Sequence, residues 1–256
     1  MTKAKNLAIG IDIGGSGIKG APVSMKSGNF KADRLRIPTP ENAAPGEIAE
    51  IVATIVRHFD IPNAPVGVTF PAPVFNGTVP FVANLSQDWA GVNASELFTA
   101  TLGRPVSVLN DADAAGLAEV HFGAAHGRMG TVLALTLGTG IGSALVHNGV
   151  LVPNTEFGHI YLPELPDGVP DAEKWASSAI LKNEGLSMEE WAGRLQKIFA
   201  AYELYLAPDM IIVGGGVSKR HDQFLPLIET RAELIPATLR NKAGIVGAAL
   251  MAYQNR

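Results

Sequence analysis

The chain has 256 residues, of which 47% are hydrophobic, and it carries a formal net charge of −4. This length suits one large domain or two modest ones, and the acidic balance argues against a general binder of nucleic acid or anionic membranes. Cysteine is absent, which excludes disulfides and thiolate metal sites. Residues 1–6 are polar, with no signal-peptide core, and no apolar run is long enough to span a bilayer. We therefore expect a cytoplasmic protein.

The first third of the chain has the pattern of an α/β domain. Two apolar runs, 7–13 and 21–24, flank a glycine-rich turn and predict a hairpin, and a more polar strand is expected over 30–37. Apolar residues at helical spacing predict a helix over 45–59, and a further apolar run predicts a strand over 64–70. Strands that alternate with helices in this way build an α/β layer.

The first glycine-rich turn has the composition of a phosphate-binding loop. Glycines let a backbone approach an anion closely and point its N–H groups at phosphate. Residues 15–20 match the pattern G-x-G-x-x-G, but that dinucleotide fingerprint must open a helix, and here a strand follows. A plain hairpin turn is the alternative interpretation. Asp12, just before the turn, could hold a hydrated Mg²⁺ beside bound phosphate.

The next polar loop, 81–91, has the composition of a small polar-ligand pocket, and Asn84 is its best candidate contact. A helix over 94–102 is predicted to follow it.

The strand predicted over 105–109 ends abruptly in Asn110 and Asp111, and an Ala-rich helix over 112–122 follows. Asn and Asp are favoured helix N-caps, so capping is one interpretation. A strand-end carboxylate that the helix N-terminus keeps ionised could instead accept a proton from a substrate hydroxyl. In the same helix we expect Glu119 to face solvent.

The strand, glycine turn and strand pattern occurs a second time. An apolar run over 131–137 leads to Gly138-Thr139-Gly140-Ile141-Gly142, and an apolar run over 143–147 follows. The repetition is more specific than either hairpin alone, and it predicts two duplicated lobes around a cleft.

Glu156 and His159 have the E-x-x-H spacing that can ligate metal on paired helices. Pro153 and Gly158 argue against a helix here, and no second E-x-x-H is present. These two side chains could hydrogen-bond substrate hydroxyls, or they could simply pair with each other in a loop.

A third glycine-rich strand end is predicted at Gly214-Gly215-Gly216, after a strand over 210–213, where a nucleotide could lie flat or the chain could simply turn into a helix. Apolar periodicity predicts helices over 172–184, 188–205, 217–231 and 243–253.

Five motifs, in order along nearly the whole chain, resemble those of the ROK family of sugar kinases, which belongs to the actin-like ATPase superfamily. They are Asp12-Ile13-Gly14-Gly15-Ser16, Asn110-Asp111-Ala112-Asp113, Gly138-Thr139-Gly140-Ile141-Gly142, Glu156-Phe157-Gly158-His159 and Gly214-Gly215-Gly216. The resemblance implies an α/β, two-lobed actin-like ATPase/hexokinase (ribonuclease H-like) fold with a central cleft. It implies an N-terminal lobe over 1–109, a C-terminal lobe over 110–242, and a final helix, about 243–256, that packs back on the first lobe.

Many ROK members carry a cysteine-rich zinc motif after the Gly-His pair. This chain has no cysteine and has Asp171-Ala172-Glu173 in that region, so no structural zinc is expected. The departure resembles the polyphosphate glucokinase branch, as do residues 67–71 and 153–156. Within the family, the chain is most similar to the bacterial polyphosphate/ATP-dependent glucokinases and glucomannokinases.

The resemblance also implies roles for individual residues. Asp111 would be the catalytic base for the sugar 6-hydroxyl, and Asp12 would organise Mg²⁺ through water. The other sugar hydroxyls would be held by Asn84, Asn110, Glu156, His159 and Glu173. The phosphate and nucleotide would be bound by Asp12, Gly14, Gly15, Ser16, Gly17, Lys19, Thr136, Gly138, Thr139, Gly140, Gly214, Gly215 and Gly216.

The expected reaction is phosphoryl transfer from polyphosphate, ATP or both to glucose, with mannose as a second candidate sugar. An ATP-only hexose kinase is the first alternative. A sugar-binding ROK regulator is the second, although no DNA-binding helix-turn-helix precedes Asp12. A polyphosphate chain would need a basic track, with Lys19, Arg128, Lys182, Lys219, Arg220, Arg240 and Lys242 as candidates. No nucleic-acid or membrane partner is expected, and a homodimer is the commonest assembly.

Overall fold

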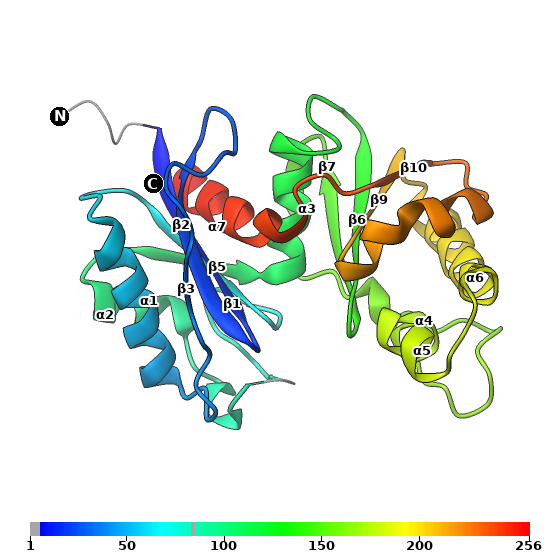
Figure 1. Cartoon of the computed structure of the whole chain (residues 1–256), viewed down its shortest axis with the longest axis horizontal. Coiled ribbons are helices and arrows are strands. Elements are labelled where there is room, and N and C mark those ends of the chain that lie inside the picture. The colour runs from blue at the N-terminus through cyan, green and yellow to red at the C-terminus, as the bar shows by residue number, and fades with distance from the viewer. Residues whose placement is uncertain (1–5, 83–84) are drawn as a thin grey trace. The chain divides into compact units, whose positions relative to one another are not determined.

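The computed structural model describes residues 6–82 and 85–256, so Asn84 lies outside the described residues. The chain forms two compact units (Figure 1). Unit 1 comprises Met1–Ala118 and Asn241–Arg256, and unit 2 comprises Glu119–Arg240. Each unit is built on a five-stranded mixed sheet with helices, which confirms the predicted α/β class. No helix in the described part of the chain is long and apolar enough to cross a membrane.

The sheet of unit 1 has the strand order β3-β2-β1-β4-β5. Its strands are β1 (Leu7–Gly14), β2 (Gly17–Ser24), β3 (Leu35–Ile37), β4 (Val66–Phe70) and β5 (Val106–Asn110). Strands β1, β4 and β5 are parallel, whereas β2 and β3 continue the sheet as antiparallel strands. The strand expected over 30–37 is therefore shorter than predicted.

Helices cover both faces of this sheet. Successive side chains of a strand point to opposite faces, so Ile9 and Ile11 of β1 pack with α1 (Pro45–Phe59) and α2 (Ala94–Leu102). The intervening Gly10 faces α7 (Ala243–Gln254), where a Cβ would overlap the carbonyl oxygen of Ile245. The last helix of the chain thus packs on the first strand, as Figure 1 shows in red against blue.

The sheet of unit 2 has the order β10-β9-β6-β7-β8. Its strands are β6 (Thr131–Leu137), β7 (Ile141–His147), β8 (Val150–Val152), β9 (Met210–Gly214) and β10 (Glu233–Pro236). Side chains of β6 and β9 alternate between a face covered by α6 (Met188–Leu206) and a face that packs with Val120 of α3 (Asp111–Phe122).

The two sheets share one topology, which confirms the predicted duplication. Read from the antiparallel edge, each sheet runs third strand, second, first, fourth, fifth, with the last two parallel to the first. Each begins with a hairpin around a glycine-rich turn, at residues 15–16 in unit 1 and 138–140 in unit 2.

Two helix predictions fail in unit 2. The segment 172–184 forms two short helices, α4 (Glu173–Ala176) and α5 (Ser178–Asn183), because Ser177 is extended. The segment 217–231 is not an α-helix, because Pro226 disfavours helical backbone before it and the chain already leaves helical geometry at Arg220. The described 3₁₀ turns are Gln87–Trp89, Phe157–His159, Gly216–Gln223, Leu225–Leu227 and Arg240–Lys242.

The expectation that Glu119 faces solvent is wrong. Its side chain is buried, with 2% of the residue exposed. The carboxylate accepts hydrogen bonds from the backbone N–H groups of Ala124 at 2.8 Å, Thr238 at 3.2 Å and Leu239 at 2.7 Å. Glu119 therefore fixes the end of α3 to the segment that leads out of unit 2.

Candidate active site

The carboxyl ends of β1, β4 and β5 meet at one edge of the first sheet, where ligands of open α/β sheets bind. Asp12 on β1 lies beside Thr69 on β4, and Phe70 lies beside Asn110 on β5. The register therefore brings Asp12, Asn110 and Asp111 to the same edge. Two strand spacings, about 10 Å, separate β1 from β5.

The Asp12 carboxylate is held by neighbours on three elements. The Thr69 hydroxyl donates to its Oδ1 at 3.0 Å, and the Lys19 ammonium on β2 lies 3.7 Å from its Oδ2. At the first turn of α7, a Cβ at Gly244 would come within 3.2 Å of Oδ1. A helix N-terminus favours negative charge, so this position would attract phosphate.

Two side chains that sequence reasoning missed hydrogen-bond to the backbone of the first glycine-rich turn. The Arg36 guanidinium donates to the carbonyl of Ser16 at 2.6 Å, and the Thr39 hydroxyl donates to the carbonyl of Gly14 at 2.5 Å. A polar cavity of about 370 Å³ adjoins Gly15 and extends toward Ser86. These two bonds hold the carbonyl groups of Gly14 and Ser16, on either side of Gly15.

Asn110 performs the capping role that the sequence allowed. Its side-chain oxygen accepts hydrogen bonds from the backbone N–H groups of Ala112 at 2.7 Å and Asp113 at 3.3 Å. Asp111 is the first residue of α3 and is exposed, although its Oδ1 lies 2.8 Å from the same Ala112 nitrogen. The two roles are therefore divided: the buried amide caps the helix, and the carboxylate at the helix N-terminus stays accessible to a substrate.

In unit 2 the glycine turns also meet at the carboxyl edge of the sheet. β6 and β9 are parallel neighbours, and Thr136 pairs with Gly214 in the register that Asp12 and Thr69 have in unit 1. Gly215 has φ of +85°, and a Cβ there would overlap the carbonyl of Leu137. Only glycine suits that position, so the turn at 214–216 lies directly against the end of β6 and the turn at 138–140.

The turn at 138–140 is held by the first residues of α4 and α5. The Ser178 hydroxyl donates to the carbonyl of Gly138 at 2.7 Å, and the carboxylate of Glu173 accepts from the N–H of Ile141 at 3.0 Å. Glu173 fills the space that a Cβ at Gly140 would need. Its second oxygen lies 3.2 Å from the Lys174 ammonium. Thr139 is exposed at the tip of the turn.

Glu156, His159 and Glu173 lie close enough in unit 2 for their charges to interact. Burial raises the pKa of Glu156, and the nearby Glu173 carboxylate raises it further against the opposing effect of His159. The Nδ1–H of His159 donates a hydrogen bond to the Asp171 carboxylate at 2.8 Å, and this bond raises the pKa of His159. The result is a cluster of one imidazole and two carboxylates that can donate to and accept from hydroxyl groups.

Asp171 is a further residue that sequence reasoning missed. One of its oxygens holds His159, and the other accepts from the backbone N–H of Lys174 at the start of α4. By occupying Nδ1, it leaves Nε2 of His159 for a ligand. Its position two residues before Glu173 is the only sequence signal that could have found it.

The candidates for a basic track differ in their surroundings. Arg128 pairs with Glu233 at the amino end of the second sheet, roughly 20 Å along β6 from the glycine turn. Lys242 lies 5.5 Å from the ring of Phe30, and Lys19 pairs with Asp12. Of these three, Lys19 is near a glycine turn, whereas Arg128 is at the opposite edge of its sheet from one.

Comparison with known proteins gives a consistent set of relatives. The sequence profile of the ROK family matches residues 8–174. A polyphosphate glucokinase from Mycobacterium tuberculosis is 44% identical over 242 residues, which cover 94% of this chain and 89% of the relative. A glucokinase from Streptomyces coelicolor is 29% identical over 97% of this chain and 98% of its own.

Two solved structures extend the similarity to the fold. The inorganic polyphosphate/ATP-glucomannokinase from Arthrobacter sp. strain KM superimposes with a TM-score of 0.87 at 48% identity, covering 98% of this chain and 99% of that chain. A ROK family glucokinase from Streptomyces griseus, in complex with glucose and AMPPNP, has a TM-score of 0.80 at 27% identity over 97% of this chain and 99% of that chain. The predicted actin-like ATPase/hexokinase fold is the fold of these sugar kinases.

Proposed function

This chain belongs to the ROK family, and we propose that it transfers a phosphoryl group from inorganic polyphosphate or ATP to the 6-hydroxyl of glucose. The observation that carries the proposal is the 48% identity, over 98% of the chain, to the polyphosphate/ATP-glucomannokinase. The 44% identity to a polyphosphate glucokinase supports the same reaction class, a phosphotransferase that acts on glucose. Because the first of these relatives is described as a glucomannokinase, mannose is included as a second acceptor.

In this proposal Asp111 receives the proton of the attacking hydroxyl. Its place at the start of α3, after a buried strand, supports the assignment, because the helix N-terminus favours the ionised carboxylate. An ordinary Asp has a pKa of about 3.9, far below that of a sugar hydroxyl. The mismatch is tolerable because phosphoryl transfer has a loose transition state, so the proton can leave late and positioning carries most of the catalysis.

Glu156, His159 and Glu173 are assigned to the remaining sugar hydroxyls, together with Asn110 and Asn84. Their carboxylates accept, and the imidazole Nε2 and the Asn110 amide donate. His159, Glu173 and Asn110 are each held by a neighbour that uses another of their polar atoms. Such preorganised groups orient the sugar, so that the 6-hydroxyl alone is presented for reaction.

The donor phosphates are assigned to the glycine turns, with Thr139 and Lys19 beside them. Asp12 fits a Mg²⁺ ion, because one partly exposed carboxylate is enough for a cation that keeps several waters and takes its other ligands from phosphate. Among the described residues no group of three or more His, Asp or Glu side chains forms a metal cage, in keeping with that mode of binding. When bound, Mg²⁺ would neutralise charge on the donor oxygens. The cytoplasmic location and the homodimer stay predictions.

The test is formation of sugar 6-phosphate from glucose and Mg²⁺, with polyphosphate and ATP supplied in separate reactions and mannose in a parallel series. We expect product with polyphosphate. Product with ATP alone would retain the kinase and reject the polyphosphate donor. No product with either donor, in a folded protein that still binds glucose, would reject the enzyme and favour a sugar-binding regulator.

A further inference from the structure

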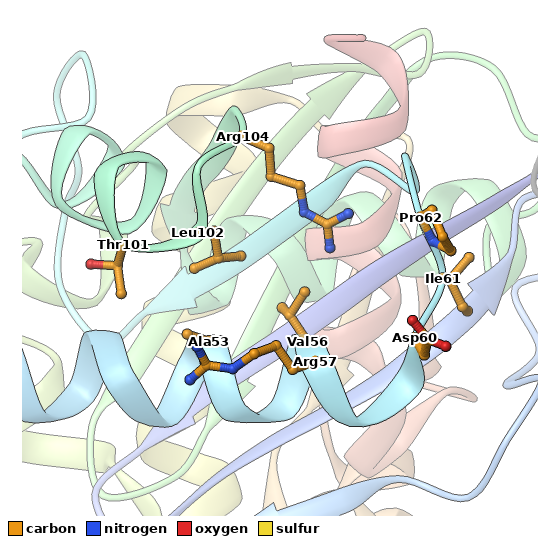
Figure 2. A pocket seen from close by; sticks show the side chains of 9 residues that line it. All are labelled: Ala53, Val56, Arg57, Asp60, Ile61, Pro62, Thr101, Leu102 and Arg104. Carbon is orange, nitrogen blue, oxygen red and sulfur yellow. The ribbon is translucent and has the colours of Figure 1, made fainter.

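Unit 1 contains a second cavity, of about 450 Å³, at a place that the proposed reaction does not use. It lies between the C-terminal half of α1, the loop after α1 and the turn from α2 to β5, as Figure 2 shows. That loop and that turn lead into the first residues of β4 and β5, Val66 and Val106, which are neighbours in the sheet. The cavity is therefore at the amino edge of the parallel strands, opposite the carboxyl edge that holds Asp12 and Asp111.

One cation in this cavity lacks a counter-charge. The Arg104 side chain points toward the centre of the lining residues (Figure 2) and is half-buried. Its guanidinium makes no hydrogen bond or ion pair with any residue that the structure describes, and burial lowers the pKa of Arg104. By contrast, Arg57 on the opposite wall already pairs with Glu50 at 3.4 Å. A partly desolvated charge without a partner costs free energy that a bound anion would recover.

The rest of the lining sets the size and polarity of a ligand. Val56 is buried, and Ile61 and Leu102 are half-buried, so they offer an apolar floor beside the guanidinium. Asp60 contributes the one carboxylate of the lining, and because Glu50 pairs with Arg57, Arg104 is the guanidinium left for an anion.

The two helix C-termini at this edge work against an anion, because each carries about half a negative charge. Here both are capped: the N–H of Asp60 bonds the carbonyl of Arg57, and the N–H of Gly103 bonds the carbonyl of Thr99. The Arg104 guanidinium carries a full positive charge, about twice the partial charge of either terminus.

We propose that this cavity binds a small organic oxyanion, a carboxylate or phosphomonoester with an apolar body, and that Arg104 is its anchor. The guanidinium presents a planar fork that pairs with two oxygens of either group. The apolar body of the ligand packs on Val56, Ile61 and Leu102. This site is separate from those assigned to the sugar and the phosphoryl donor, so it is an additional ligand site on unit 1.

Calorimetric titration of the full chain with benzoate and, separately, with phenyl phosphate tests the proposal, with phenol as the uncharged control. We expect at least one of the two anions to bind and phenol not to bind. In Arg104→Gln the affinity should fall at least about tenfold, the usual consequence of losing a charged hydrogen-bond partner. Arg34→Gln, which changes an exposed arginine elsewhere on unit 1, should bind like the original protein. The tighter of the two anions identifies the ligand as carboxylate or phosphate.

Equal affinity in the original protein and Arg104→Gln, or no binding of either anion, overturns the site.

A second experiment uses the original protein alone, so its result does not depend on whether a variant folds. Phenylglyoxal modifies accessible arginines, and mass spectrometry reports each site. The bound anion should slow modification of Arg104 and leave that of Arg34 unchanged. Equal protection of both arginines, or of neither, contradicts the proposal. Because neither readout requires phosphoryl transfer, the result is independent of the proposed enzymatic reaction.

Discussion

At the scale of single residues, Asn110 and Asp111 have different roles, so the proposal that Asp111 is the catalytic base can be tested by itself. Asn110 caps α3, so a change at Asp111 should leave the helix intact. We expect Asp111→Asn to lower kcat by roughly 10²–10⁴, the usual contribution of a general base. Steady-state kinetics with glucose, alongside circular dichroism, measure the two effects. Asp33→Asn, at an exposed carboxylate of the same unit, is the matched control. Near-normal turnover in Asp111→Asn would reduce Asp111 to a structural residue.

The contact between His159 and Asp171 predicts a pH dependence. Hydrogen bonding to Asp171 raises the pKa of His159 above its ordinary 6.5. The folded state thus favours protonated His159, and this stability is fully present below pH 6.5 and is lost as the pH rises through the raised pKa. Asp171→Asn should lower the pKa of His159 while it keeps an acceptor for the N–H of Lys174.

Histidine NMR titration of the original protein and of Asp171→Asn measures this shift directly. The difference in unfolding free energy between the two proteins should be greatest below pH 6.5 and should shrink at higher pH. Asp167→Asn, an exposed change in the same segment, should leave the His159 titration curve where it is. A His159 pKa that is the same with and without the Asp171 carboxylate would show that the contact does not form in solution.

Single residues were predictable from sequence where their partners are local. Asn110 bonds groups two and three residues away, and capping is a local pattern. Glu119 was misread because two of its partners, Thr238 and Leu239, are more than a hundred residues along the chain. Arg36 was missed for a related reason: an arginine on a polar strand carries no sign that its guanidinium reaches the turn at Ser16.

At the scale of elements, α7 lies on the first sheet at positions where the strands carry glycine. A Cβ at Gly67 of β4 would overlap the carbonyl oxygen of Ala248 on α7. We therefore expect Gly67→Ala to force the helix away from the sheet and to destabilise the protein by about 1–3 kcal/mol, the range for overpacked cores. Gly46→Ala in the exposed first turn of α1 meets nothing within 4 Å, so it should be neutral or slightly stabilising.

Urea denaturation of the two alanine variants and the original protein gives these free energies. If Gly67→Ala were as stable as Gly46→Ala, α7 would have room to move and the close approach would not be a constraint on the fold.

Helices and strands were predictable where apolar residues recur at a regular spacing and where proline, glycine or a capping residue marks the ends. The bounds of α1 and α2 match the prediction. Pro45 marks the start of α1, Asn93 marks the start of α2, and Gly103 marks its end. The segment 217–231 has apolar residues at helical intervals, but the backbone leaves helical geometry at Arg220 and Pro226 prevents a continuous helix. β10 was not predicted, since four residues that end in proline carry too little pattern, and only the pairing with β9 defines them as a strand.

At the scale of the whole molecule, unit 1 is closed by residues from both ends of the chain, whereas unit 2 is one continuous segment. In α7, eight of twelve residues are buried: Ala243, Ile245, Val246, Gly247, Ala248, Ala249, Leu250 and Ala252. Removal of residues 241–256 would therefore expose one apolar face of the first sheet to water. The face of the second sheet that packs on α6 is complete within unit 2 and would not be affected.

We expect a chain ended at Arg240 to lose the structure of unit 1 and to retain that of unit 2. Hydrogen exchange followed by mass spectrometry resolves the two. Peptides from β1 and β4 should exchange fast in the truncated chain, while those from β6 and β9 keep their protection, because exchange protection follows the local cooperative unit. A chain ended at Gln254 keeps α7 whole and should exchange like the original protein. Equal loss of protection in β1 and β6 would mean that the two units unfold together. In that case α7 would stabilise the entire molecule and not unit 1 alone.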